Sequence, residues 1–211
     1  MKIGLLGATG GTGREVLKQA LERGHEVIVL ARRPDAVGVE HPGLSVRRAD
    51  ATDASSVSDG LRGAELVISS LGLSRGQLFE RTTFYSDSGR VLLDAMKANG
   101  ISRLLAITSG GVEHDDPSFA FFYKWVLKPI LLSRAYADME RLEALVRDSD
   151  RDWTLVRPTA LTDTPATGRY RVSPRFSPTG GTQISRADLA AFLLDTAEQG
   201  GWIRGTPTVA Y

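Results

Sequence analysis

The residues best placed to do chemistry begin at a glycine-rich turn near the N-terminus, Gly7-Ala8-Thr9-Gly10-Gly11-Thr12-Gly13. The turn follows a short apolar strand, Lys2 to Leu6, and precedes helical spacing over 13–23. Glycines at such a junction let backbone N–H groups approach a phosphate closely, and the next helix directs its positive end toward it. The pattern predicts a dinucleotide pyrophosphate site, and an ordinary tight turn is the alternative. The predicted contacts are Gly7, Thr9, Gly10, Gly11, Thr12 and Gly13.

Two arginines follow the second predicted strand, Glu26 to Leu30, at the position that distinguishes NAD from NADP. An acid there would bind the ribose 2′-hydroxyl, but the chain has Ala31-Arg32-Arg33. A guanidinium binds a 2′-phosphate through paired hydrogen bonds, whereas a carboxylate repels it. Arg32 and Arg33 therefore favour NADP(H), with Arg32 the better placed. The alternative is that both are solvated surface residues.

Other strand ends extend the predicted cofactor site. Asp50 ends the third predicted strand, where it could meet an adenine amino group, or it could be a helix N-cap or turn residue. Leu71-Gly72 follows the fourth strand, Leu66 to Ser70, where a loop passes the nicotinamide-side ribose.

A serine follows the fifth predicted strand, Arg103 to Ile107, at the place where many dehydrogenases have one. Such enzymes add a Tyr and a Lys four residues apart, but Leu127 lies four residues after Tyr123, and Glu140 four after Tyr136. The missing pair argues against routine alcohol–ketone interconversion and favours a flat conjugated acceptor, which delocalises charge. Ser109 is the predicted catalytic contact near the nicotinamide, with a strand-end cap as the alternative.

The substrate-side candidates are His114, Phe122 and Tyr123. The aromatic stretch from Phe119 to Trp125 could form a wall over the nicotinamide or a packing or dimer surface, and its position after a strand favours the wall. His114 could reach the substrate or be an ordinary loop residue beside acids. No cluster has metal-ligand spacing, so we expect no metal.

Strand and helix patterns alternate along the whole chain. Helical spacing recurs over 80–98, 136–148 and from Arg186 to Ala197; further strands are predicted at Ser45 to Ala49, Trp153 to Val156 and Pro207 to Ala210. The third strand is the most polar and should lie near an edge. The alternation predicts an α/β Rossmann-type fold, a doubly wound parallel sheet with helices on both faces. We expect one domain over 1–211, with 110–135 and 160–182 as substrate-side excursions.

Composition excludes several classes of function. The 211 residues are 42% hydrophobic and 24% charged with net charge +1, so no global field attracts nucleic acid or an anionic membrane. Without cysteine there is no disulfide, thiolate metal site or thiol nucleophile. The first residues lack a signal-peptide pattern, and we expect a cytoplasmic protein that is a monomer or a weak homodimer.

The chain resembles the atypical short-chain dehydrogenases of the NmrA-like NAD(P)-binding group, and within it the biliverdin-IXβ reductase, or flavin reductase, branch. The matching residues are Gly7 to Gly13, Val29 to Arg32, Leu71-Gly72, Thr108-Ser109, 147–149, 167–170 and 184–189. The resemblance implies a Rossmann domain that binds NADPH and passes hydride to a flavin or linear tetrapyrrole, with Thr108 and Pro158 beside the cofactor. Where that branch has a histidine after the sixth strand, this chain has Ala160.

The favoured function is therefore an NADPH-dependent oxidoreductase that transfers hydride to a flavin, quinone or tetrapyrrole-like small molecule. Two alternatives stay open. One is a non-catalytic NADP(H)-binding redox sensor of NmrA type, because the missing Tyr–Lys pair suits it equally. The other is a tailoring reductase or isomerase of a biosynthetic pathway.

Overall fold

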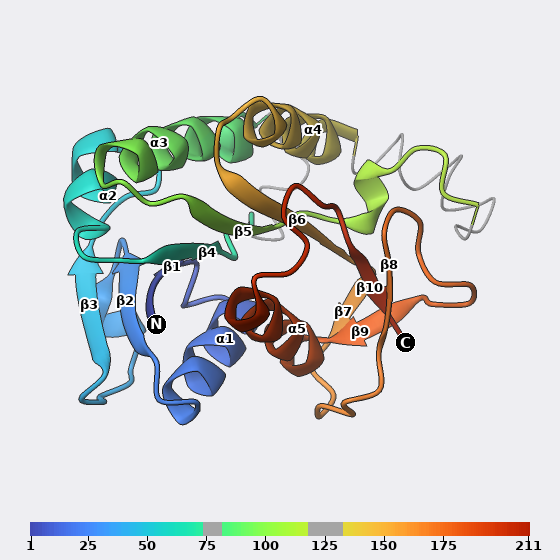
Figure 1. The fold of residues 1–211 in the computed structure, drawn as a ribbon, viewed down its shortest axis with the longest axis horizontal. Coiled ribbons are helices and arrows are strands. Elements are labelled where there is room, and N and C mark those ends of the chain that lie inside the picture. Colours follow the sequence, from blue (N-terminus) through green and yellow to red (C-terminus); the bar gives the residue numbers. More distant parts are fainter. Residues whose placement is uncertain (74–81, 118–132) are drawn as a thin grey trace.

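The computed structural model describes residues 1–73, 82–117 and 133–211, which surround a mostly parallel sheet (Figure 1). Its strand order is β3-β2-β1-β4-β5-β6-β10-β8. The first six strands follow the doubly wound Rossmann order, which confirms the predicted fold class, and the polar strand β3 lies at an edge. β8 pairs with β10 in the antiparallel direction. The bounds are β1 Lys2–Leu6, β2 Glu26–Ala31, β3 Leu44–Arg48, β4 Leu66–Ser69, β5 Arg103–Ile107, β6 Asp152–Pro158, β8 Arg171–Ser173 and β10 Thr208–Ala210.

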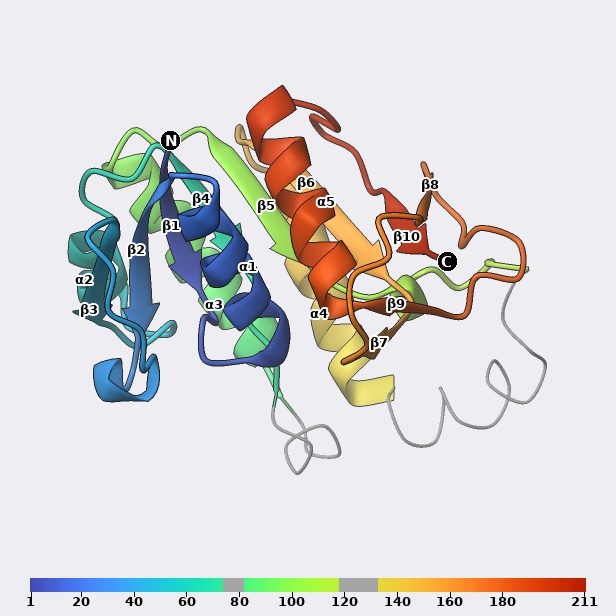
Figure 2. The ribbon, with the colours of Figure 1, turned by 90° about the horizontal axis from the view of Figure 1, so that it is seen from below.

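Helices cover both faces of the sheet. Helices α1 (Gly11–Glu22) and α5 (Arg186–Gln199) lie side by side on one face, and α2 (Ala54–Gly60), α3 (Phe84–Ala98) and α4 (Ser133–Arg147) cover the other (Figures 1 and 2). Short 3₁₀ helices occur at Pro34–Ala36 (η1) and Gly110–Val112 (η3). Within the described ranges, no helix is long and apolar enough to cross a membrane.

Two hydrophobic clusters, one on each face, explain why the strands are almost continuously apolar. In β1, Ile3 and Leu5 are buried in the cluster beneath α1 and α5, while Leu6 belongs to the cluster beneath α3 and α4. Successive side chains of a strand point to opposite faces, so a sheet covered on both sides needs apolar residues at nearly every position.

The structure contains short elements that the pattern analysis did not predict. Helix α2 has seven residues and is started by Asp53, whose carboxylate accepts the N–H of Ser56 at 2.9 Å. At the two ends of the 160–182 segment, β7 (Ala160–Thr162) pairs in parallel with β9 (Gln183–Ser185), which follows the segment, as a separate two-stranded sheet. Elements this short span too few residues to show a hydrophobic period.

Candidate functional site

The glycine-rich turn connects β1 to α1 at the end of the sheet toward which the parallel strands point (Figure 2). Gly7 has a φ of +84°, which favours glycine, and its carbonyl accepts the N–H of Gly10 at 3.0 Å. Helix α1 then begins at Gly11, and no described side chain caps its N-terminus. The N–H groups of its first turn therefore lack a side-chain acceptor and suit an anion.

Gly13 lets the helix pack directly against the end of the strand. A Cβ atom there would lie 2.1 Å from the carbonyl oxygen of Gly7 and 2.7 Å from Oγ of Ser70. Ser70 in turn donates from its hydroxyl to the carbonyl of Leu6 at 3.1 Å, which joins β4 to the same turn. Any larger residue at position 13 would push the helix away from the strand.

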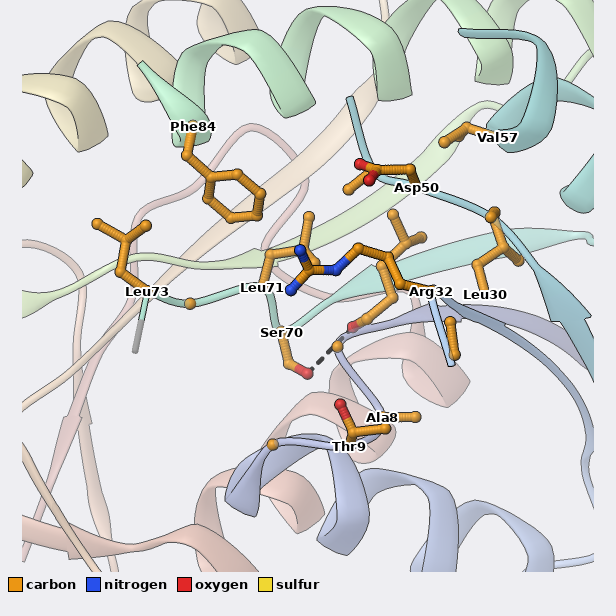
Figure 3. Close-up of a pocket in the computed structure, with 17 residues that line it drawn as sticks. Ala8, Thr9, Leu30, Arg32, Asp50, Val57, Ser70, Leu71, Leu73 and Phe84 are labelled. Atoms are coloured by element: carbon orange, nitrogen blue, oxygen red, sulfur yellow. Dashed lines mark hydrogen bonds between the residues drawn. The ribbon is translucent and has the colours of Figure 1, made fainter. Parts of the chain in front are cut away.

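A cleft of about 340 Å³ opens in front of this turn (Figure 3), and its size is within the usual range of ligand pockets. It brings together residues that follow four different strands, because the carboxyl ends of parallel strands meet at one edge. Seven residues predicted from the sequence line it, namely Gly7, Thr9, Gly10, Arg32, Asp50, Leu71 and Gly72.

Arg32 and Asp50 supply the charges of the cleft. Figure 3 shows the Arg32 side chain extending into the pocket, and Asp50 lies on the neighbouring strand end. Asp50 accepts the backbone N–H of Thr52 at 3.0 Å and its hydroxyl at 2.8 Å. These hydrogen bonds hold the pKa of Asp50 below its ordinary value, and Arg32 adds a smaller lowering. Asp50 is thus both a turn residue and part of the cleft wall.

The other predicted cofactor residues lie outside the cleft lining. Gly11, Thr12 and Gly13 form the first turn of α1, and Arg33 is exposed just before η1. Thr108 and Pro158 are buried at the ends of β5 and β6.

Several residues of the wall had no signal in the sequence. Phe84, the first residue of α3, lines the cleft with Leu73 and Ser70. The backbone N–H of Leu73 donates to the hydroxyl of Tyr85 at 3.2 Å, and the N–H of Tyr85 donates to buried Asp138 of α4 at 2.8 Å. A carboxylate 53 residues away thus caps α3, so no local pattern could place Phe84 here.

Ser109 caps the short helix η3, since its hydroxyl accepts the N–H of Gly111 at 3.2 Å. The ring of Tyr136 packs on Gly111 so closely that a Cβ there would lie 2.5 Å from the tyrosine oxygen. Four residues after Tyr136, Glu140 pairs with Nε2 of His114 at 2.8 Å, where the dehydrogenase pattern has a lysine. Phe122 and Tyr123 lie outside the described residues, and so does the predicted aromatic wall.

A buried ionic network fixes both sides of the Ser109 turn. Arg157 of β6, only 4% exposed, makes two hydrogen bonds to Glu143 of α4, at 3.0 and 2.6 Å. Glu143 also accepts the Thr108 hydroxyl at 2.8 Å, and Arg157 reaches Glu113 at 3.1 Å. Burial alone would lower the pKa of Arg157, but its carboxylate partners outweigh burial and raise it. The guanidinium therefore stays charged and ties Thr108 and Glu113 to the sheet.

The described residues contain no group of three His, Asp or Glu side chains that could hold a metal ion. The Rossmann strand order and the cleft at the glycine turn define a dinucleotide-binding protein. A family model described as NAD(P)H-binding matches residues 7–199. The chain therefore belongs to this NAD(P)H-binding family of oxidoreductase type, which confirms the predicted class of cofactor.

Similar proteins cover almost the whole chain. The uncharacterized protein YwnB of Bacillus subtilis is 29% identical over 214 residues, which are 94% of this chain and 92% of YwnB. The structure of ChuY, an anaerobillin reductase from Escherichia coli O157:H7, is 26% identical with a TM-score of 0.80, covering 100% of this chain and 97% of ChuY. A Veillonella parvula short-chain dehydrogenase/reductase in complex with NADP, at 16% identity and a TM-score of 0.79 over 100% and 94% of the two chains, shares the fold.

The packing of the glycine turn predicts a specific cost for a methyl group. We expect Gly13→Ala to lower the free energy of unfolding by about 1–3 kcal/mol, because the added carbon meets rigid backbone. Gly201→Ala is the matched control, since a Cβ there meets nothing within 4 Å. Urea denaturation of both variants measures the difference, and equal effects would contradict the close packing.

The buried network predicts a large effect of removing one charge. Glu143→Gln should cost about 3–5 kcal/mol in urea unfolding, because it leaves the buried Arg157 without its main counter-charge. Glu198 of α5 is a half-exposed residue that pairs with Arg23 and His25. The substitution Glu198→Gln should therefore cost less than about 1 kcal/mol. A Glu143→Gln variant as stable as Glu198→Gln would show that the network contributes little.

Proposed function

We propose that this protein is an NADPH-dependent reductase that transfers hydride to a flat conjugated acceptor, such as a flavin, a quinone or a tetrapyrrole-like molecule. The observation that carries the proposal is the guanidinium of Arg32 in the same cleft as the glycine turn, on a strand end that has no acid. This pairing of a pyrophosphate site with a cation at the ribose position fits a dinucleotide with a 2′-phosphate.

In this proposal each group of residues around the cleft contacts a different part of the dinucleotide. The amides of the turn hold the pyrophosphate, Arg32 pairs with the 2′-phosphate, and Asp50 accepts from the adenine amino group. Leu71 and Gly72 contact the nicotinamide-side ribose. The bound cofactor supplies the hydride, and the chain supplies orientation and an environment that excludes water.

The surroundings of Ser109 favour an acceptor that needs no strong acid. On helix α4, Glu140 lies four residues after Tyr136, at the position where a dehydrogenase has the lysine that lowers the pKa of its tyrosine. An extended conjugated acceptor spreads the incoming charge and takes its proton from solvent. The likeness to ChuY supports a tetrapyrrole-like acceptor, and Ser109, His114, Phe122 and Tyr123 are the residues that we propose contact it.

Replacing Arg32 should separate the two nicotinamide cofactors. We expect Arg32→Ala to raise the KM for NADPH on the order of tenfold or more, because a paired charge-assisted contact is lost, and to leave the KM for NADH nearly unchanged. Arg90→Ala, an exposed arginine of α3, serves as the control. Equal effects on both cofactors would remove Arg32 from the 2′-phosphate site.

Replacing Ser109 should affect turnover and spare cofactor binding. We expect Ser109→Ala to lower kcat on the order of tenfold with FMN or biliverdin, because a polar contact beside the nicotinamide is lost. The Kd of NADPH, followed by its fluorescence, should stay within about twofold. Unchanged turnover would exclude Ser109 from the reacting centre.

The same assays test the whole proposal. NADPH consumption by the wild-type protein with FMN, biliverdin or a quinone series would support a reductase. Tight NADP binding with no turnover on any acceptor would contradict it, and would favour a redox sensor.

A further inference from the structure

Arg186 lies beside the glycine turn although it is distant from it in sequence. It is the first residue of α5, after Ser185, whose hydroxyl caps that helix. Helices α1 and α5 pack along each other, and both begin at the edge toward which the parallel strands point (Figure 2). The start of α5 is therefore brought next to the start of α1.

The contact between the two helix starts is very close. A Cβ atom at Gly11 would lie 2.6 Å from Nε of Arg186 and 2.7 Å from its Cδ. The arginine side chain thus lies directly over the first residue of α1. This contact accounts for Gly11, the one glycine of the turn that falls outside the three-residue spacing of Gly7, Gly10 and Gly13, because a side chain at position 11 would displace Arg186.

The charge of Arg186 is unfavourably placed unless an anion lies nearby. The N-terminus of α1 carries a partial positive charge, and no described side chain caps it. A guanidinium at this point is repelled by the helix and attracted by any anion held there. Within the described residues its guanidinium pairs with Asp163 at 2.7 Å, and the Asp163 side chain is 87% exposed on the loop after β7.

We propose that Arg186 is a second cationic ligand of the cofactor pyrophosphate, and that Asp163 holds its guanidinium over the turn when no cofactor is bound. The proposal rests on the cofactor site described above. When the pyrophosphate occupies the N-terminus of α1, the Arg186 guanidinium pairs with a phosphate oxygen, either in place of Asp163 or in addition to it. Arg186 and Arg32 then act on different phosphates, the first on the group common to NADH and NADPH and the second on the 2′-phosphate.

Titrations of NADPH, NADH and ADP-ribose, followed by fluorescence or calorimetry, test this assignment. Arg186→Gln should weaken all three by the same factor, about tenfold, because each contains the pyrophosphate. Asp163→Asn should tighten all three about two- to fivefold, because the competing carboxylate is removed. Misfolding cannot produce tighter binding, so Asp163→Asn tests the proposal even if Arg186→Gln is unstable.

Arg23→Gln is the matched control. Arg23 follows α1 and pairs with carboxylates of α5. Its side chain is 28% exposed, compared with 26% for Arg186, but it lies at the other end of the two helices. Its loss should leave all three affinities within about twofold. If the wild-type protein binds the three ligands and Arg186→Gln changes their affinities no more than Arg23→Gln does, the role of Arg186 is overturned and the proposed function is not. An effect confined to NADPH, or to the KM of the acceptor, also overturns it. A wild-type protein that binds none of the three removes the proposed function itself.

Discussion

The close packing of α1 against the end of β1 is the constraint on which the cleft at the glycine turn depends. It is possible because Gly13 has no side chain, and it aims the first N–H groups of the helix into the cleft. The charged side chains around this point are the ones that we propose bind the phosphates of the cofactor. Arg32 and Asp50 stand at the neighbouring strand ends, and Arg186 approaches from the second helix of the same face.

Along the carboxyl ends of the strands, charged residues are exposed near the glycine turn and buried near β5 and β6. Around the glycine turn, Arg32 and Asp50 are exposed to the cleft, where a ligand can meet them. Around β5 and β6, Arg157 and Glu143 are buried and satisfy each other, which fixes the backbone on either side of Ser109. Exposed charge suits recognition of an ionic ligand, whereas buried paired charge holds a precise geometry.

Membership of the NAD(P)H-binding family establishes the class of cofactor, and the acceptor is the part of the function that we propose. The turn that contains Ser109 has Tyr136 packed on it and the His114–Glu140 pair beside it. This arrangement differs from the dehydrogenase pattern at one decisive place, because a carboxylate stands where a lysine would assist a tyrosine. This difference is the basis of our proposal of an acceptor that delocalises charge.

From the sequence one could predict the doubly wound order of β1 to β6, the helices with clear periods, the glycine turn and the arginine at the end of β2. These features depend on local dihedral freedom and on hydrophobic period, which neighbouring residues encode. Three features could be seen only in the folded protein: Phe84 lines the cleft, Thr108 donates to Glu143 and Arg186 lies over Gly11. Each of those contacts joins residues far apart in the chain, and their meeting depends on how the helices pack on the sheet, which no local pattern records.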